Sequence, residues 1–214
     1  MERESRSRPY HSRVREESAR RTREAIVCAA TLLFIRDGYA GTSWEALAEA
    51  AGVSRPTVVT AFGTKAALLS QVLDESLAGN DDLGPVRDRP WFRPVWEATT
   101  AAETLDTYAR VCVLIARRAA GVIEALHRAA DSSPEVDALW ERWLTGRRAG
   151  AAMVVGHPPL TRALAPGMGA DQAVDVLWTL NNPDLYLGLV TGAGWTEDAF
   201  EAWLARTMRT ALLS

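Results

Sequence analysis

Apolar residues recur at intervals of three and four along most of the chain, the spacing that places them on one face of an α-helix. Such stretches cover residues 26–34, 47–51, 66–79, 101–128, 134–155, 171–180, 183–190 and 197–212. A polar run with two prolines and a glycine separates two of them at residues 80–93. The pattern predicts an all-α protein, with a long helix over 101–128 that Gly121 could break.

Residues 42–65 predict two short helices joined by a tight turn. Thr42 or Ser43 can accept backbone N–H groups where the first helix begins, and Thr42 and Glu45 have the spacing of a capping box. Gly52 follows the last apolar residue of that helix, at a point where helices commonly end in a left-handed conformation that glycine adopts cheaply. This arrangement predicts a helix-turn-helix, a motif with which many proteins bind DNA.

The second helix of this motif, residues 55–62, has the size and the start signals of a DNA-recognition helix. Ser54 can cap it, and Pro56 lies in its first turn, where the missing N–H of proline costs nothing. At about 1.5 Å per residue the helix is roughly 12 Å long, short enough to lie in the major groove. Val58 and Phe62 are four residues apart and should face the core, which leaves the opposite face for DNA.

The next helix should begin at Thr64 and Lys65, and a helix N-terminus attracts phosphate through its unpaired N–H groups and its dipole. Lys65 is the only lysine in the chain. We therefore expect these two residues to contact the DNA backbone. The residues predicted to lie at the DNA are Thr42, Ser43, Trp44, Ser54, Arg55, Pro56, Thr57, Thr60, Thr64 and Lys65.

The run from Thr22 to Leu69 resembles the N-terminal domain of the tetracycline-repressor (TetR) family, over about a quarter of the chain. The resemblance rests on a first helix ending in Gly38-Tyr39, on Thr42-Ser43, Leu47-Ala48 and Ala51-Gly52-Val53-Ser54, and on Pro56-Thr57-Val58, Phe62, Thr64-Lys65 and Leu68-Leu69. It implies a ligand-responsive repressor that binds a near-palindromic double-stranded DNA operator as a homodimer and is released by a small-molecule effector. The remaining helices fit the variable ligand-binding domain of that family.

Two positions depart from the family pattern. The family usually carries a tyrosine where this chain has Val59, and a histidine or tyrosine where it has Ala61, and both are frequent phosphate contacts. Phosphate contacts add affinity without reading sequence, so their loss predicts weaker or differently distributed backbone binding. An alternative therefore stays open: a helical small-molecule-binding or adaptor protein that has lost specific DNA binding.

Charge divides the chain unevenly. Residues 1–65 hold eleven basic and eight acidic side chains, a net charge of +3, whereas residues 66–214 hold thirteen and nineteen, a net charge of −6. A modestly basic end on an acidic body confines the attraction for DNA to one surface. We predict a disordered Arg-rich arm over 1–21, a helix-turn-helix domain over 22–66, and a helical ligand-binding and dimerisation domain over 67–214.

The N-terminal arm is the most basic part of the chain. Residues 1–23 contain eight arginines against four glutamates, a net charge of +4, with little apolar content. Such a segment cannot bury a core of its own. Two interpretations stay open: a solvated tail without a defined contact, or an arm that follows the DNA backbone or enters the minor groove.

The last predicted helix carries a regular apolar stripe that suits packing against another helix. The stripe includes Phe200, Trp203, Leu204, Thr207, Met208 and Ala211. The residues alone leave two explanations open, an interface between subunits or an intramolecular core. The TetR resemblance favours the interface, because C-terminal helices form a four-helix contact between subunits in that family.

Candidate ligand-binding residues are those with an apolar body and a polar tip, because buried polar groups seek partners. They are Tyr108, Cys112, His127, Trp140, Trp178, Asn181, Asn182 and Tyr186. A mostly apolar pocket with an amide and aromatic rings would suit a hydrophobic or aromatic ligand. Cys28 and Cys112 lie singly in helical stretches, which is typical of buried small hydrophobic residues.

Other classes of protein find little support in the sequence. The three histidines are too scattered for a metal site, and we expect neither a metal nor a cofactor. We expect no enzyme, because the chain has no Gly-rich phosphate loop and no nucleophile motif. The chain also has no secretory signal and no run of about 20 apolar residues that could span a bilayer, so a cytoplasmic location is expected.

Overall fold

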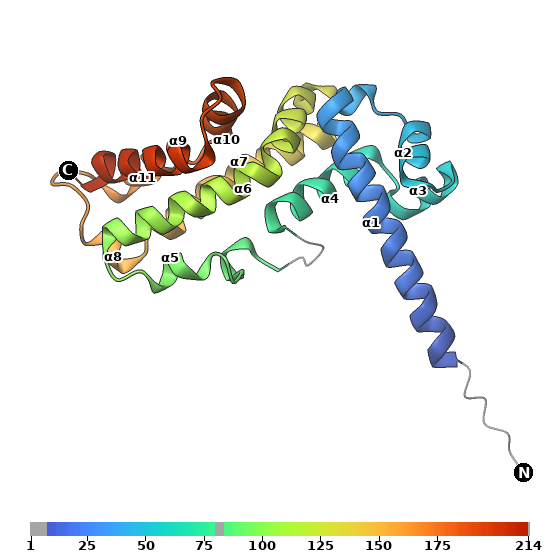
Figure 1. Ribbon diagram of the computed structural model, residues 1–214, viewed down its shortest axis with the longest axis horizontal. Helices are drawn as coiled ribbons and strands as arrows, with labels where there is room; N and C mark the ends of the chain where they lie inside the picture. The colour runs from blue at the N-terminus through green and yellow to red at the C-terminus, as the bar shows by residue number, and fades with distance from the viewer. Residues whose placement is uncertain (1–7, 80–83, 214) are drawn as a thin grey trace, which may run out of the picture. The chain divides into compact units, whose positions relative to one another are not determined.

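A computed structural model describes residues 8–79 and 84–213, with side chains from residue 15 onward. Every regular element in these ranges is helical, which confirms the predicted all-α class (Figure 1). The chain divides into two compact units, residues 1–72 and 73–214.

The first unit contains α1 (Arg8–Gly41), α2 (Trp44–Ala51), α3 (Arg55–Phe62) and the first half of α4 (Lys65–Ala78). Within α1, Gly38 leaves helical geometry with φ 75° and ψ 170°, so the regular helix ends before it and the chain turns towards α2. Apolar side chains from all four helices form one core. Its most buried members are Ile26, Ala30, Phe34, Leu47, Val58, Leu68, Leu69 and Val72.

The N-terminal region differs from the predicted disordered arm. Residues 8–21 belong to α1, and residues 1–7 of the predicted arm lie outside the described residues. Arg20 pairs with Glu24 at 2.7 Å, and Arg21 pairs with Glu17 at 3.1 Å, each four residues apart. Such pairs stabilise an exposed helix by a few tenths of a kcal/mol each. Composition alone missed them, because the spacing of the charges, and not their number, supports the helix.

The second unit is built around α6 (Ala101–Ala129), which packs against α5, α7, α8, α10 and α11 (Figure 1). The other elements are η1 (Val86–Asp88), α5 (Arg93–Glu97), η2 (Ala130–Ser132), α7 (Pro134–Val155), α8 (Pro158–Thr161), α9 (Ala170–Leu180), α10 (Pro183–Tyr186), η3 (Leu187–Gly192) and α11 (Glu197–Leu213). Thr100 and Ser133 cap α6 and α7 by accepting backbone N–H groups three residues ahead.

Gly121 does not interrupt α6, which runs as one helix over 29 residues. A glycine inside a helix costs about 1 kcal/mol relative to alanine. On either side of it, Ala119, Ala120, Val122 and Ile123 are all at most 3% exposed. Burial of these neighbours outweighs the local cost, so the helix continues.

The apolar stripe of α11 lies largely within the core of the second unit. Phe200, Leu204 and Met208 are 0–2% exposed, so they cannot contact another subunit, and the interface predicted for them is corrected to an intramolecular core. The stripe fits both explanations in sequence because core and interface use the same spacing. Trp203, Thr207 and Ala211 are half-buried and keep some surface for a partner.

Candidate functional site

The start of α2 distinguishes between the two candidate caps. The Ser43 hydroxyl accepts the backbone N–H of Ala46 at 3.1 Å, which makes Ser43 the N-cap. Thr42 is buried and donates its hydroxyl to the Gly38 carbonyl at 2.8 Å, so it holds the end of α1 to the start of α2. Glu45 pairs with a residue of α3 and takes no part in a capping box with Thr42.

The turn between α2 and α3 has the predicted geometry. Gly52 adopts the left-handed conformation, with φ 65° and ψ 32°, and the Val53 N–H reaches back to the Ala48 carbonyl at 3.0 Å. Ser54 then caps α3 by accepting the N–H of Thr57 at 3.3 Å, and the two hydroxyl groups lie 2.8 Å apart. This network fixes the direction in which α3 leaves the turn.

The two faces of α3 have different surroundings. Val58 and Phe62 are buried in the core of the first unit. Five residues form an exposed or partly exposed face of α3: Arg55, Pro56, Thr57, Val59 and Thr60. None of the five is needed for the core, so this face is available for an external partner.

Arg55, at the first position of α3, forms an ion pair with Glu45 in the protein without DNA. Its Nε lies 2.8 Å from a carboxylate oxygen of Glu45 on α2, and both side chains are more than half exposed. An exposed pair of this kind is worth about 0–1 kcal/mol. A stronger acceptor, such as a guanine edge or a phosphate, can therefore replace Glu45.

The start of α4 is tied to the preceding helices. Thr64 caps it by accepting the Ala67 N–H at 3.0 Å. The Lys65 Nζ donates to the Thr42 carbonyl at 3.0 Å and lies 4.5 Å from the centre of the Tyr39 ring. Partial burial lowers the pKa of Lys65. Lys65 thus has a structural role that the sequence did not reveal, and it keeps donors for a phosphate because an ammonium group has three.

Sequence reasoning missed Arg23 as a member of this surface. Its Nη1 donates to the Ala61 carbonyl at 2.6 Å, and its guanidinium lies 4.4 Å from the centre of the Phe62 ring. The side chain is exposed and covers the C-terminal end of α3, where a helix dipole favours a positive charge. A cation therefore lies beside the position where Ala61 itself offers no phosphate contact. Trp44, the aromatic residue of the predicted DNA-binding set, is half-buried at the start of α2.

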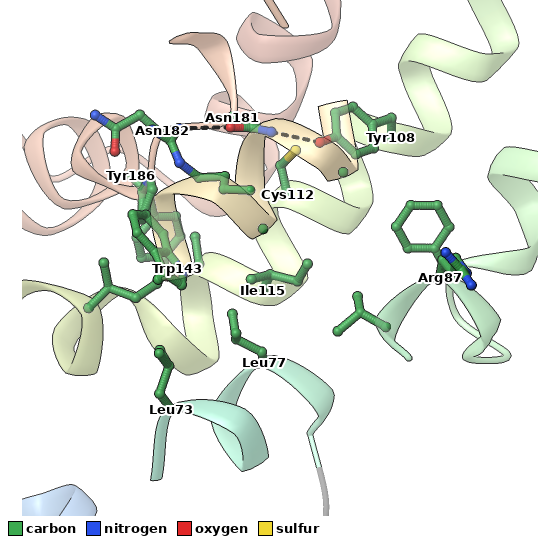
Figure 2. Close-up of a pocket in the computed structure, with 18 of the residues that line it drawn as sticks. Leu73, Leu77, Arg87, Tyr108, Cys112, Ile115, Trp143, Asn181, Asn182 and Tyr186 are labelled. Carbon is green, nitrogen blue, oxygen red and sulfur yellow. Dashed lines mark hydrogen bonds between the residues drawn. The ribbon is translucent and has the colours of Figure 1, made fainter. Parts of the chain in front are cut away.

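A cavity of about 400 Å³ opens in the second unit (Figure 2). Such a volume is within the range of about 300–1,000 Å³ that small-molecule sites occupy. Its walls come from the C-terminal end of α4, from residues 85–92 around η1, and from α6, α7, α9, α10 and α11. The apolar and aromatic residues of these walls include Leu73, Leu77, Val86, Phe92, Ile115, Ile123, Trp143, Leu180, Tyr186 and Phe200.

One end of the cavity carries a hydrogen-bonded polar cluster. The side-chain amide of Asn181 donates to the Tyr108 hydroxyl at 2.8 Å, and its oxygen accepts from Nη1 of Arg147 at 2.8 Å. The dashed lines at Asn181 in Figure 2 mark these bonds. The same Nη1 donates to the Trp178 carbonyl at 2.6 Å. Burial raises the pKa of Tyr108, so its hydroxyl stays neutral.

Arg147 is held between two indole rings. Its guanidinium carbon lies 5.0 Å from the centre of the Trp143 ring and 4.8 Å from that of Trp178. Its Nε is buried without a hydrogen-bond partner, and within residues 15–79 and 84–213 no carboxylate forms an ion pair with the guanidinium. Burial lowers the pKa of Arg147, yet an arginine remains protonated in proteins. The carboxylate of Asp184 acts on this charge through space and favours it, but no ion pair joins them, so the guanidinium lies in the cavity wall without a bonded carboxylate in the described chain.

The two cysteines differ from the sequence expectation. Cys112 lines the cavity and is half-buried, and burial raises the pKa of its thiol to about 12. Cys28 is exposed on α1, so its predicted burial is wrong. The helical spacing there places Ile26 and Val27 in the core, and position 28 falls on the opposite side.

The structure gathers part of the predicted ligand set. Tyr108, Cys112, Asn181, Asn182 and Tyr186 line the cavity, whereas His127, Trp140 and Trp178 do not. His127 stacks on Trp140 with ring centres 4.4 Å apart, and Trp140 stacks on Trp143 at 5.2 Å. Arg147 and Trp143 were not among the predicted ligand-binding residues, although their spacing of four places them on one face of α7.

Over the part of the chain that the structure describes, no helix is long and apolar enough to cross a membrane. Comparison with curated proteins gave no match. Residues 26–72 match the family model of bacterial regulatory proteins, tetR family. The matched segment contains α2, α3 and the start of α4, together with most of the core of the first unit.

Several solved structures share the fold over nearly their whole length. NalD, the secondary repressor of the MexAB-OprM multidrug efflux pump in Pseudomonas aeruginosa, is 22% identical with a TM-score of 0.66, covering 92% of this chain and 98% of its own. A transcriptional regulator assigned in Saccharomonospora viridis, solved with choline, is 19% identical with a TM-score of 0.67, covering 90% and 97%.

A third structure, assigned to the TetR-family regulators of Mesorhizobium loti, is 21% identical with a TM-score of 0.64, and the alignment covers 92% of this chain and 98% of that one. Identities this low speak for the fold alone, whereas the family model speaks for the helix-turn-helix segment itself. Residues 26–72 therefore match the tetR family of bacterial regulatory proteins over the helix-turn-helix segment, and the chain shares the fold of solved TetR-family regulators.

Proposed function

We propose that the protein is a ligand-responsive transcriptional repressor that binds a near-palindromic operator as a homodimer. The observation that carries the proposal is the exposed face of α3: a capped helix of eight residues whose outward side chains have no role in the core. A helix of this length fits the major groove by its N-terminal end.

On the DNA side, Arg55, Thr57 and Thr60 are the residues that we assign to base reading. Thr42, Ser43, Trp44, Ser54, Thr64 and Lys65 border the same helices and are assigned to the approach to the backbone, with Thr42 acting through its main chain because its side chain is buried. We add Arg23, whose exposed guanidinium at the Ala61 carbonyl supplies a positive charge where the side chain of residue 61 cannot.

Dimerisation is required by this function, because two recognition helices must lie about one helical turn of DNA apart to read a near-palindrome. We assign the interface to the outer faces of α9 and α11. These helices pack against each other, and α11 keeps Trp203, Thr207 and Ala211 half-exposed. Homodimers join such faces by the same patch on both subunits.

On the ligand side, α4 links the two units as one continuous helix. It begins at Lys65 beside α3, and its last two turns, at Leu73 and Leu77, line the cavity. A ligand that contacts these residues can shift α4 and with it the spacing of the recognition helices. Changing operator occupancy from 99:1 to 1:99 takes about 5.5 kcal/mol of ligand preference, so the cavity must supply extensive burial or several polar contacts.

The cavity walls support a hydrophobic or aromatic small molecule as effector, and the solved relatives support only a small-molecule effector in general. NalD represses a multidrug efflux pump, and the Saccharomonospora viridis protein was solved with choline. The walls of the cavity in this chain are mainly apolar and aromatic. We accordingly expect a cytoplasmic regulator without catalytic turnover of its ligand.

The first test is selection of bound sequences from a random duplex pool at physiological salt. Enrichment of a near-palindrome with half-sites about one helical turn apart is the expected result. The absence of any enriched sequence would favour the alternative of a ligand-binding protein without specific DNA binding. This alternative rests on Val59, whose side chain is 36% exposed, and on Ala61, because neither residue can make the usual phosphate contact.

Acidic substitutions test the proposed dimer interface. Trp203→Asp and Ala211→Asp should each convert dimers to monomers in sedimentation velocity, and Ala211 is included because its small side chain contributes little packing to the fold. Ala138→Asp, on an exposed position of α7, is the matched control and should leave the dimer unchanged. Dimers of unchanged strength in both interface variants would place the contact elsewhere.

A further inference from the structure

The charges that line the cavity oppose those of the surrounding region. Three arginines (Arg87, Arg142 and Arg147) and one acid (Asp74) contribute to its walls, a formal charge of 3 − 1 = +2. Residues 66–214 as a whole carry a net charge of −6. A positive site within an acidic region favours an anion over a cation, because field lines concentrate in a low-dielectric cavity.

Among these cations, Arg147 has the surroundings of a ligand-binding group. Its Nη1 bonds neutral oxygens of Trp178 and Asn181, its Nη2 has no hydrogen bond to any described residue, and neither has its buried Nε. Asp184 offsets part of this partly buried charge through space without an ion pair, and an arriving carboxylate bonded to the guanidinium would offset the remaining cost. The planar guanidinium, fixed between the rings of Trp143 and Trp178, is suited to bind two carboxylate oxygens at once.

The hydrogen-bonded polar cluster lies at one end of the cavity, and the α4 end presents Leu73 and Leu77 beside one acid, Asp74. Tyr108 and Asn181 stand at one side in Figure 2, and Leu73 and Leu77 of α4 stand at the opposite side, with Ile115 between them. A ligand with its head at Arg147 would place an apolar body against α4. Its head supplies affinity, and its body makes the contact that can move the helix.

We propose that the cavity takes an amphipathic organic carboxylate, with its head group on Arg147, Asn181 and Tyr108 and its apolar body against Leu73 and Leu77. This inference rests on the proposed function, in which the same cavity holds the effector. It assigns this chain a ligand of the opposite charge to choline, the molecule bound by the Saccharomonospora viridis protein.

The test compares three probes that share one apolar body: decanoate, decan-1-ol and decyltrimethylammonium. Isothermal titration calorimetry of the full chain at physiological salt, below micelle-forming concentrations, measures each affinity. Decanoate should bind at least about tenfold more tightly than decan-1-ol, because hydrogen bonds to charged groups are about twice as strong as neutral ones. The ammonium probe should bind most weakly. Equal affinity for the three probes, or a preference for the cation, would overturn the proposal.

Two variants identify the group responsible. Arg147→Gln removes the charge and keeps hydrogen-bond donors, so the preference for decanoate over decan-1-ol should disappear while affinity for decan-1-ol remains. Asn181→Asp has nearly the same shape and gives Arg147 a carboxylate partner, so it should abolish the same preference without removing the arginine. Because the two variants disturb the fold differently, folding failure in one leaves the other informative.

Arg148→Gln is the matched control. Arg148 is the next residue on α7, is exposed, pairs with Asp175 at 2.7 Å, and does not line the cavity. Its substitution should leave the preference for decanoate over decan-1-ol unchanged. If Arg148→Gln also lost this preference, the net charge of the protein, and not a contact with Arg147, would be its cause. Operator selection is read separately. If the protein enriches an operator but does not prefer decanoate, the proposed function stands and the carboxylate site is wrong. If it prefers decanoate but enriches no operator, the carboxylate site stands and the proposed function is wrong.

Discussion

Three arginines show how surroundings set the role of one residue type. Arg55 is exposed and paired with Glu45, a contact weak enough to exchange. Arg23 is fixed on a carbonyl at the end of α3 and keeps its surface exposed. Arg147 lies between two indole rings with neutral acceptors only. The first is suited to read a base, the second to hold a phosphate and the third to bind an anionic ligand.

We expect Arg55→Ala to relax sequence preference by about 1–3 kcal/mol at one operator position, because a bidentate contact to guanine is worth that much. Glu45→Gln should act in the opposite direction. It removes the competing partner of Arg55, an exposed pair worth up to about 1 kcal/mol, and should raise operator affinity by up to about fivefold. Both effects are measured by titrating the selected operator and its single-base variants at constant salt.

Glu49→Gln is the control for the second variant. Glu49 is exposed on the same helix α2 and makes no ion pair with a described residue, so its substitution removes the same charge without releasing Arg55. An equal gain in affinity from both substitutions would mean that general charge, and not the pair, limits binding. A uniform loss over all operator variants in Arg55→Ala would assign Arg55 to phosphate.

The cysteines allow a second prediction at the residue scale. Alkylation at pH 8 should modify Cys28 rapidly and Cys112 slowly, because the thiolate is the reactive form. Burial raises the pKa of Cys112 to about 12, about four pH units above the reaction, so its thiolate fraction is on the order of one in ten thousand. Peptide mapping by mass spectrometry reports each site. Equal rates at the two cysteines would show that the cavity is far more open to water than its walls indicate.

At the scale of elements, the helices near the turn could be predicted from sequence because their ends are encoded locally. Ser43, Gly52 and Ser54 act through their own backbone neighbours, so sequence spacing contains the relevant geometry. Gly121 could not be interpreted in the same way. The cost of a glycine in α6 is local, but the burial that offsets it comes from other helices.

The cavity residues could be predicted only in part for the same physical reason. Tyr108, Asn181 and Tyr186 were identified because polar tips on apolar bodies are recognisable in any sequence. Trp140 has the same chemistry, yet it stacks on His127 away from the cavity. Which face of a helix meets a cavity is decided by tertiary packing, and that information is absent from local spacing.

The end of α4 is the element for which we predict the clearest change in stability. Gly79 follows α4 with φ +84°, and a Cβ added there would overlap the Arg118 guanidinium. Gly79→Ala should therefore lower the free energy of unfolding by about 1–2 kcal/mol for the left-handed backbone, plus the cost of moving Arg118. Urea unfolding followed by circular dichroism measures the loss.

Gly146→Ala serves as the control for that substitution. Gly146 lies inside α7, and a Cβ added there has no atom within 4 Å. An alanine at this position should raise the free energy of unfolding by about 0.5–1 kcal/mol. A stabilising effect of Gly79→Ala would show that the end of α4 adopts another conformation.

At the scale of the whole molecule, the two units are joined by α4, a helix of 14 residues and about 21 Å. Its first turn holds Lys65, which bonds the Thr42 carbonyl, and its last turns hold Leu73 and Leu77 in the cavity wall. A helix transmits displacement along its axis because its backbone hydrogen bonds resist bending. The same element therefore carries residues of both proposed sites, the one for DNA and the one for the ligand.

The coupling between the two partners is reciprocal by thermodynamic linkage, whichever element transmits it. If decanoate lowers operator affinity by some factor, the operator must lower decanoate affinity by the same factor, since both follow from one coupling free energy. We expect a factor of about 5–150, corresponding to 1–3 kcal/mol. Operator titrations with saturating decanoate and calorimetric decanoate titrations with saturating operator measure the two factors independently. Unequal factors would mean that decanoate acts on operator binding through a second site or through aggregation. Equal factors in the unchanged protein, together with no effect of decanoate on operator affinity in Arg147→Gln, would link the effect to this cavity.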